Sequence, residues 1–160
     1  MNIRMGSAWA AWLGVIMIVG GMVLTGCAPC VKYSFDPKAD FSVVKTYQWA
    51  PGSPASREEA LLEKNIQYFA DQALAKKGYS VAAEKPDMVF SMKYEYELGS
   101  YQASYQFTML SLFAHRAGAK ELFWQGTATG TMIGNIKADA GSGKLGETIH
   151  KILLNFPPKR

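Results

Sequence analysis

The most reactive side chains are two cysteines, Cys27 and Cys30, which stand in the spacing Cys-Ala-Pro-Cys. Thioredoxin-type redox proteins use this spacing, and there a helix N-terminus lowers the pKa of the first thiol. Here the residues that follow, Val31 to Phe35, alternate in the manner of a β-strand. We therefore do not interpret the pair as a redox site. Cys30 is left as an odd thiol that could pair between molecules or be modified.

Cys27 ends an N-terminal segment with the layout of a secretory signal. Arg4 lies near the amino terminus, and an uncharged run of 17 residues extends from Ala8 to Leu24. An uncleaved transmembrane helix is the alternative, because about 20 residues span a bilayer. Three glycines in the run weaken such a helix. In either case the positive-inside rule keeps Arg4 in the cytoplasm and places the remainder in the periplasm.

The residues that end this segment are Leu24, Thr25, Gly26 and Cys27, and they resemble the lipobox of bacterial lipoproteins. The resemblance implies that Cys27 receives a diacylglyceryl thioether and that the signal is cut before it. The new amino group is then acylated by a fatty acid such as palmitate. Several acyl chains, at about 0.8 kcal/mol per buried methylene, make a durable membrane anchor. By the same resemblance, Ala28 in place of Asp implies transfer to the outer membrane.

The chain divides into four parts on this interpretation. Residues 1–26 are the signal peptide, and 27–40 are a lipidated N-terminus with a short tether and a possible first strand. Residues 41–158 form a single domain, and 159–160 are a basic tail. Of the 17 basic residues only Arg4 lies in the signal, so 16 remain against 13 acidic residues, a net charge of +3. Such an excess is more often a solvated surface than a binding site, and secretion excludes nucleic acid as a partner.

The clearest secondary-structure element is a helix that begins after Ser56. Ser56 and Glu59 form a capping box, in which each side chain satisfies a free amide at the helix start. Apolar residues then recur at helical spacing, and Gly78 supplies the left-handed cap that ends the helix. The apolar stripe consists of Leu62, Ile66, Phe69 and Ala73.

Alternating residues predict a strand from Phe41 to Trp49 and a longer one after the helix. Gly99-Ser100 suits a two-residue type II′ turn from the longer strand into its neighbour. The apolar face of the longer strand holds Met88, Phe90, Met92, Tyr94 and Tyr96. The turn then pairs Phe90 with Met109, Met92 with Phe107, Tyr94 with Tyr105, and Tyr96 with Ala103.

A second hairpin follows by the same reasoning. A Gly118-Ala119 loop sets Arg116 opposite Glu121, Phe113 opposite Trp124, and Phe107 opposite Gly130. After Trp124 the core face of the third strand is small, which allows a helix to approach the sheet closely. The small residues are Gly126, Ala128 and Gly130.

A short amphipathic helix is predicted around Leu145, Ile149 and Phe156, and Pro157-Pro158 ends it. The fold class is therefore α+β. We expect an antiparallel β-sheet meander with one long amphipathic helix and a short C-terminal helix packed on it.

These registers predict an apolar patch on the face opposite the main core. Val89, Leu110 and Leu112 gather there with Phe123 nearby, on a face that is otherwise polar. Four such side chains are enough to attract a partner. We favour the C-terminal helix as the cover, and an envelope protein partner is the alternative.

Five short motifs follow one another between Val31 and Pro158, and together they resemble the bacterial lipoproteins grouped as domain of unknown function 4136 (DUF4136). The resemblance implies an envelope lipoprotein with a compact α+β domain and carries over no catalytic residue. The usual Arg after Trp in this family is Gln125 here. The motifs are Lys45-Thr46-Tyr47-Gln48-Trp49, Lys77-Gly78-Tyr79, Pro86-Asp87-Met88, Leu122-Phe123-Trp124-Gln125-Gly126 and Asn155-Phe156-Pro157-Pro158.

Catalytic and metal chemistry finds little support. His115, expected on the core face, and His150, beside the stripe of the last helix, lack the spacing of a metal pair, so neither a metal nor a cofactor is expected. Glu95 and Glu97 share the polar face of one strand and could serve acid/base work on a glycan, but a solvated strand face explains them better. The remaining candidate carboxylates are Asp87 and Asp139.

The tyrosines at the first hairpin could stack on a sugar, although aromatic packing beneath the first helix explains them better. They are Tyr94, Tyr96, Tyr101 and Tyr105. The sequence therefore favours a non-catalytic lipoprotein that binds or organises something at the membrane surface. An accessory subunit of an envelope transport or assembly system is the alternative, and a glycan-acting enzyme comes third.

Overall fold

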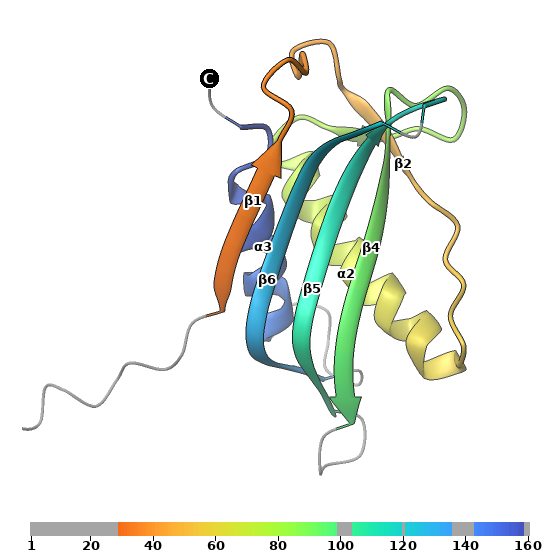
Figure 1. Cartoon of the computed structure of the whole chain (residues 1–160). Helices are drawn as coiled ribbons and strands as arrows, with labels where there is room; N and C mark the ends of the chain where they lie inside the picture. The colour runs from red at the N-terminus through yellow and green to blue at the C-terminus, as the bar shows by residue number, and fades with distance from the viewer. Residues whose placement is uncertain (1–28, 99–103, 120, 136–142, 159–160) are drawn as a thin grey trace, which may run out of the picture.

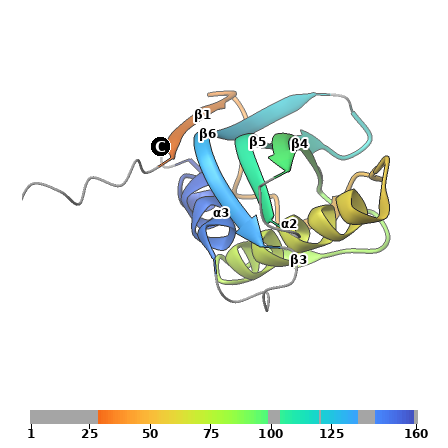
Figure 2. The ribbon, with the colours of Figure 1, turned by 90° about the horizontal axis from the view of Figure 1, so that it is seen from below.

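The computed structural model describes residues 29–98, 104–119, 121–135 and 143–158. In this part of the chain, six strands form one sheet and two helices lie on one of its faces, as Figures 1 and 2 show. The strand order is β1-β6-β5-β4-β2-β3. The elements are β1 (Cys30–Phe35), β2 (Thr46–Trp49), α2 (Arg57–Ala75), β3 (Ser80–Val81), β4 (Met88–Leu98), β5 (Ser104–Arg116), β6 (Leu122–Asn135) and α3 (Lys144–Leu154).

The α+β class is confirmed, and the sheet is mixed rather than wholly antiparallel. β4, β5, β6 and β1 pair antiparallel in that order, whereas β2 pairs parallel with both β4 and β3. Helix α2 provides the crossover between β2 and the strands parallel to it, as parallel neighbours require.

The expected signals position α2. The Ser56 hydroxyl accepts a hydrogen bond from the Glu59 amide at 3.1 Å, and the Glu59 carboxylate accepts one from the Ala55 amide at 2.6 Å. At the other end Gly78 has φ +83°, and the Tyr79 amide donates to the Leu74 carbonyl. These bonds satisfy backbone groups that the helix itself leaves unpaired.

The register predicted for the first hairpin is wrong. Phe90 pairs with Ala114 rather than Met109, and Tyr94 with Leu110 rather than Tyr105. Because the difference at each pair is five residues, an odd number, the face of β5 that meets the core is reversed. A bulge between Glu95 and Tyr96 reduces this difference to four residues, so that Tyr96 pairs with Phe107 rather than Ala103.

The second hairpin has the predicted register at its turn only. The Arg116 amide donates to the Glu121 carbonyl, but Trp124 pairs with Ala114 instead of Phe113. A bulge at the Ala114/His115 step leaves Phe123 without a partner on β5, and further along Phe107 pairs with Met132. Bulges of this kind turn a side chain to the other face of a sheet.

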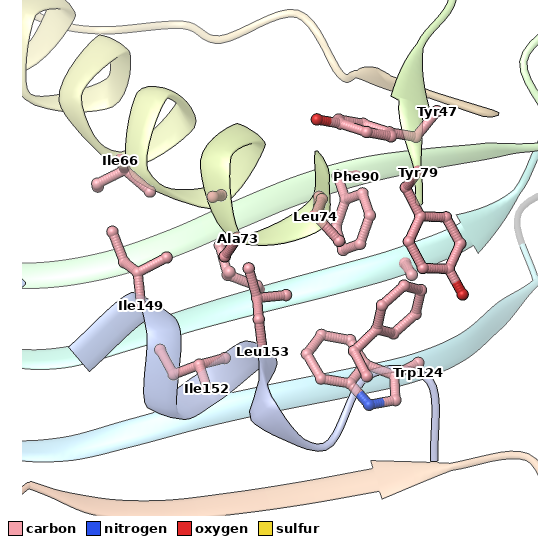
Figure 3. Close-up of a cluster of buried hydrophobic side chains, with 14 of the residues drawn as sticks. Tyr47, Ile66, Ala73, Leu74, Tyr79, Phe90, Trp124, Ile149, Ile152 and Leu153 are labelled. Carbon is pink, nitrogen blue, oxygen red and sulfur yellow. The ribbon is translucent and has the colours of Figure 1, made fainter. Parts of the chain in front are cut away.

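The core lies between the sheet and the two helices (Figure 3). Trp124, Phe90 and Phe156 are fully buried and meet edge to face, with ring centroids 5.0 to 6.5 Å apart. α3 approaches β6 at Gly126, where a Cβ atom would lie 2.7 Å from Ile152 Cγ2. Gly126 therefore allows a helix to approach the sheet closely, as predicted from its small size.

Candidate functional site

The predicted anchor residue lies close to the start of the sheet in the sequence. Leu24, Thr25, Gly26 and Cys27 lie outside the described residues, but β1 begins at Cys30, three residues after Cys27. β1 pairs with β6 over its whole length, from Cys30 opposite Thr129 to Phe35 opposite Trp124. Any group carried by Cys27 is thus separated from the folded domain by two residues.

The predicted apolar patch does not form. Leu110 and Leu112 are fully buried in the core on the same side as Phe90, because the hairpin register is reversed relative to the prediction. Phe123 is also buried, and its ring lies 5.4 Å from that of Phe41. Only Val89 faces the other side of the sheet, where it is half-buried.

A row of acids on α2 receives hydrogen bonds from aromatic side chains of the sheet. Glu59, Glu63 and Asp71 are spaced by multiples of four residues and therefore share one helix face. The bonds are Tyr96 Oη to Glu59 Oε1 at 2.7 Å, Tyr94 Oη to Glu63 Oε1 at 3.0 Å, and Tyr47 Oη and Trp49 Nε1 to Asp71 Oδ1 at 2.7 and 2.9 Å.

These bonds also fix protonation. Burial, reinforced by the hydrogen bond to Asp71, raises the pKa of Tyr47, and burial with the Glu63 bond raises the pKa of Tyr94. The Tyr96 hydroxyl and the Ala55 amide lower the pKa of Glu59. Tyr47 and Tyr94 therefore stay neutral hydrogen-bond donors, and Glu59 stays a charged acceptor. These bonds serve to hold the helix against the sheet.

Four tyrosines were expected to pack beneath the first helix, and the structure describes the side chains of two of them. Tyr94 and Tyr96 do lie against α2, with ring centroids 5.9 Å apart. Tyr101 and the side chain of Tyr105 lie outside the described part of the chain. The sequence reasoning missed the acids that receive these hydroxyls, although their four-residue spacing was available as a signal.

A cleft of about 220 Å³ opens beside the middle of this row, between α2 and the edge of β4. The segment that follows β2 forms one wall, and Trp49, Glu63 and Gln67 line the others. The Glu63 oxygen that faces Tyr94 is already bonded. The cleft is small compared with the pockets of about 300–1,000 Å³ that hold small-molecule ligands.

A second, shallower depression of about 520 Å³ lies on the sheet face without helices. His115, predicted for the core face, is instead half-buried on this face opposite Val89. Ser91 Oγ lies 3.4 Å from His115 Nε2, which is long for an activated nucleophile and its base. His150 is exposed on α3.

The remaining candidate groups do not gather. Glu95 and Glu97 are exposed on the helix-free side, and Asp139 lies outside the described residues. Among the residues that the structure places, no three His, Cys, Asp or Glu side chains could hold a metal ion. None of the described helices is both long and apolar enough to span a membrane.

Asp87 has a structural position at the starts of β2 and β4. One carboxylate oxygen accepts the Lys45 and Thr46 amides at 2.9 and 2.8 Å and the Thr46 hydroxyl at 2.8 Å. These bonds lower the pKa of Asp87. Two motifs of the resemblance, Lys45–Trp49 and Pro86–Met88, therefore meet at this carboxylate. Gln125, in the position of the family's usual Arg, donates to the Thr127 hydroxyl at 3.1 Å.

Solved structures with a similar fold include two different proteins. A PDZ domain protein from Parabacteroides distasonis is 14% identical with a TM-score of 0.57; the match covers 81% of this chain and only 36% of that protein. PelC from Paraburkholderia phytofirmans, solved as a dodecamer, is 14% identical with a TM-score of 0.55, over 82% of this chain and 99% of PelC. At such identities the likeness concerns the fold alone.

The comparison with curated proteins gives no match. The family model for the domain of unknown function DUF4136 matches residues 31–158, which is nearly all of the chain from β1 onward. The motifs that meet at Asp87 and the packed Trp124 lie inside this match, and the chain belongs to the DUF4136 family.

Proposed function

We propose that the protein is a lipid-anchored lipoprotein of the cell envelope, held at the periplasmic face of the outer membrane. In this role its domain is a non-catalytic binding or structural module that works close to the lipid. Membrane lipid, reached through an acylated Cys27, is its first partner, and an envelope protein is the second.

The observation that carries this proposal is the position of β1. A lipobox-like sequence ends at Cys27, and a fully paired strand begins at Cys30. The two residues between them span at most about 10 Å from Cα to Cα of the flanking cysteines. The lipid would therefore hold the lower end of the sheet in Figure 1, where β1 starts, within a short distance of the membrane surface.

The described carboxylates support a non-catalytic role. Asp71, Glu59, Glu63 and Asp87 each accept hydrogen bonds from the protein itself. A glycan hydrolase needs two carboxylates on opposite sides of a bound sugar. Glu95 and Glu97 project from one strand on the same open face, which does not provide that arrangement.

Mass spectrometry of the membrane-extracted protein tests the anchor. We expect the mature chain to begin at Cys27 with diacylglyceryl and N-acyl groups, and Cys27→Ala to accumulate as an unprocessed precursor. Density fractionation then locates the wild-type protein. An unmodified Cys27 contradicts the lipoprotein role, and recovery only in the inner membrane contradicts the placement.

An accessory subunit of an envelope assembly is the second candidate. PelC, which shares the fold over 99% of its own length, is a dodecamer. Chemical crosslinking in intact cells followed by purification distinguishes the candidates. An assembly subunit yields one stoichiometric complex with other proteins, whereas an independent module yields no constant partner other than copies of itself.

A further inference from the structure

We infer that the free edge of β4 pairs with strand β1 of a second copy of this chain, so that anchored copies join head to tail through their sheets. The inference rests on the proposed lipid anchor for the orientation of the copies. The segment that would occupy the edge of β4 is β1, which has a defined length, direction and charge.

The edge of β4 is only partly covered. β2 pairs with Met88, Val89 and Phe90, and the last bond of that pairing runs from the Ala50 amide to the Phe90 carbonyl at 2.7 Å. Among the described residues, no strand pairs with this edge from Ser91 to Glu95. Backbone groups alternate along an antiparallel strand, so those of Met92 and Tyr94 point to the same side as the Phe90 carbonyl.

The segment after β2 borders this edge at Ser91 and Met92, across the cleft of about 220 Å³, but does not pair with it. It runs from Ala50 to the start of α2 without strand pairing, and it contains Pro51 and Pro54, which have no amide hydrogen to donate. A row of unpaired backbone groups is a template for another strand.

β1 is the matching element at the opposite edge of the same sheet. In the described part of the chain it pairs with β6 alone and has six residues, Cys30–Phe35. Figure 1 shows that β1 and β4 point in opposite directions. Copies anchored in one membrane leaflet share their orientation, so β1 of one copy lies antiparallel to β4 of the next.

The anchor also excludes pairing between like edges. Two β1 strands related by a two-fold axis would be antiparallel and would place their Cys27 residues at opposite ends of the joined sheet. One leaflet cannot hold both ends. Head-to-tail contact remains, and repetition of a head-to-tail contact closes a ring when the rotation permits it.

The position of β2 and the charges on the two strands favour one register between β1 of one copy and β4 of the next. At equal height the sheet places Cys30 level with Glu95 and Lys32 level with Lys93, through the rows that cross β6 and β5. In that register Lys32 would face Lys93. Phe35 would face Phe90, whose backbone is already paired with β2. A two-residue offset removes both conflicts.

In the offset register Lys32 lies opposite Glu95, which is favourable, and Tyr33 lies opposite Tyr94. Tyr33 is 49% exposed in the single copy, so it has apolar area to bury there. The offset is about 7 Å along the strands, and closing a sheet on itself requires such a stagger. Cys30 then faces Glu97 of the neighbouring copy.

The native Cys30 provides the test, because it is exposed and has no disulfide partner among the described residues. Glu97→Cys is made in the full-length protein, and membranes with mass-verified lipid on Cys27 are oxidised mildly. Directly opposed residues on antiparallel strands lie at disulfide distance. We expect a ladder of crosslinked dimers, trimers and larger species on non-reducing gels.

Three matched variants complete the experiment. Glu97→Cys with Cys30→Ser should give no ladder, and Glu121→Cys, an exposed acid on the β5–β6 turn, should give none. Glu95→Lys added to Glu97→Cys should weaken the ladder several-fold, and Lys32→Glu in the same chain should restore it. All exchanged acids are exposed, so circular dichroism should report an unchanged fold.

The outcomes separate this inference from the proposed function. A lipidated protein that gives no ladder, or that stops at dimers, overturns the inference and leaves the anchor intact. Wild-type dimers through Cys30 also overturn it, because they require two β1 strands side by side. An unmodified Cys27 overturns the proposed function whatever the gels show.

Discussion

Thr46 and Asp87 are hydrogen-bonded to each other in both directions. The Thr46 hydroxyl donates to the Asp87 carboxylate at 2.8 Å, and the Asp87 amide donates to the Thr46 hydroxyl oxygen at 3.0 Å. The Ala117 amide donates to the Asp87 carbonyl, so the β5–β6 turn is tied to the same residue. Three elements that are distant in sequence are therefore held together at one residue, Asp87, through its carboxylate and its backbone.

Asp87 should make the domain sensitive to acid. Its pKa is lowered in the folded state by the Lys45 and Thr46 amides and the Thr46 hydroxyl, so its stabilising effect is complete above the ordinary value of 3.8 and is lost as the pH falls through the folded pKa. Asp87→Asn should flatten the decline of the urea midpoint between about pH 5 and pH 2. Glu84→Gln, an exposed acid nearby, is the control and should leave the profile unchanged.

Asp71 should stabilise the domain through its two aromatic donors. Asp71→Ala leaves Tyr47 Oη and Trp49 Nε1 without their acceptor, and we expect a loss of about 1–3 kcal/mol in the free energy of unfolding. Urea titration measures this loss. Tyr47→Phe should cost less in the Asp71→Ala background than in the wild type. Equal costs in both backgrounds would show that the bond contributes nothing.

Buried tyrosines should make the domain sensitive to alkali. The folded pKa of Tyr47 and of Tyr94 is raised, chiefly by burial, so the unfolded chain releases these protons at lower pH than the folded one. Stability is then complete below the ordinary value of 10.0 and declines as the pH rises above it. Tyrosinate absorbance from these two residues should appear together with loss of structure, and Tyr47→Phe should reduce the decline.

Gly126 should resist enlargement. A Cβ there would lie 2.6 Å from the Trp124 ring and 2.7 Å from Ile152 Cγ2, so Gly126→Ala must displace α3 or the indole. We expect a loss of about 1–3 kcal/mol by thermal or urea unfolding. Ile152→Leu removes the Cγ2 branch that would clash, so in the Gly126→Ala background it should recover part of the loss. Thr129→Ala, exposed on the same strand, is the control and should cost less than about 0.5 kcal/mol.

Leu112→Asp should unfold the domain. Leu112 is fully buried, and an unpaired carboxylate in its place costs more than most domains can lose. Val89→Asp is the matched change on the half-buried outer face and should leave a cooperative unfolding transition. A folded Leu112→Asp variant would contradict the observed register of β4 and β5, which places Leu112 in the core.

Local signals predicted the helices well because their evidence is local. Ser56, Glu59 and Gly78 cap α2 within a few residues of one another, and the apolar stripe on α2 needs only a helical period. The antiparallel order of β4, β5 and β6 followed from adjacent hairpins in the same way.

Strand register depends on features that the sequence does not display. The pairing of Leu98 with Tyr105 excludes the two-residue turn assumed at Gly99-Ser100, and bulges on both hairpins shift the pairing further. One odd shift moved Leu110 and Leu112 from a supposed outer patch into the core. The hydrogen bonds of Asp71 and Asp87 join residues 22 to 42 positions apart, which no short motif predicts.

The pairing of β1 with β6 also implies an order for two events, the modification of Cys27 and the closing of the sheet by β1. Cys30 and Thr129 are 99 residues apart, so β1 is synthesised first and finds its partner last, after the local hairpins can form. In an exported chain, enzymes that modify Cys27 would meet an extended, unpaired segment, and the sheet would close over a chain already held at the membrane. We therefore expect the unfolded Leu112→Asp variant to be processed at Cys27 as fast as the wild type.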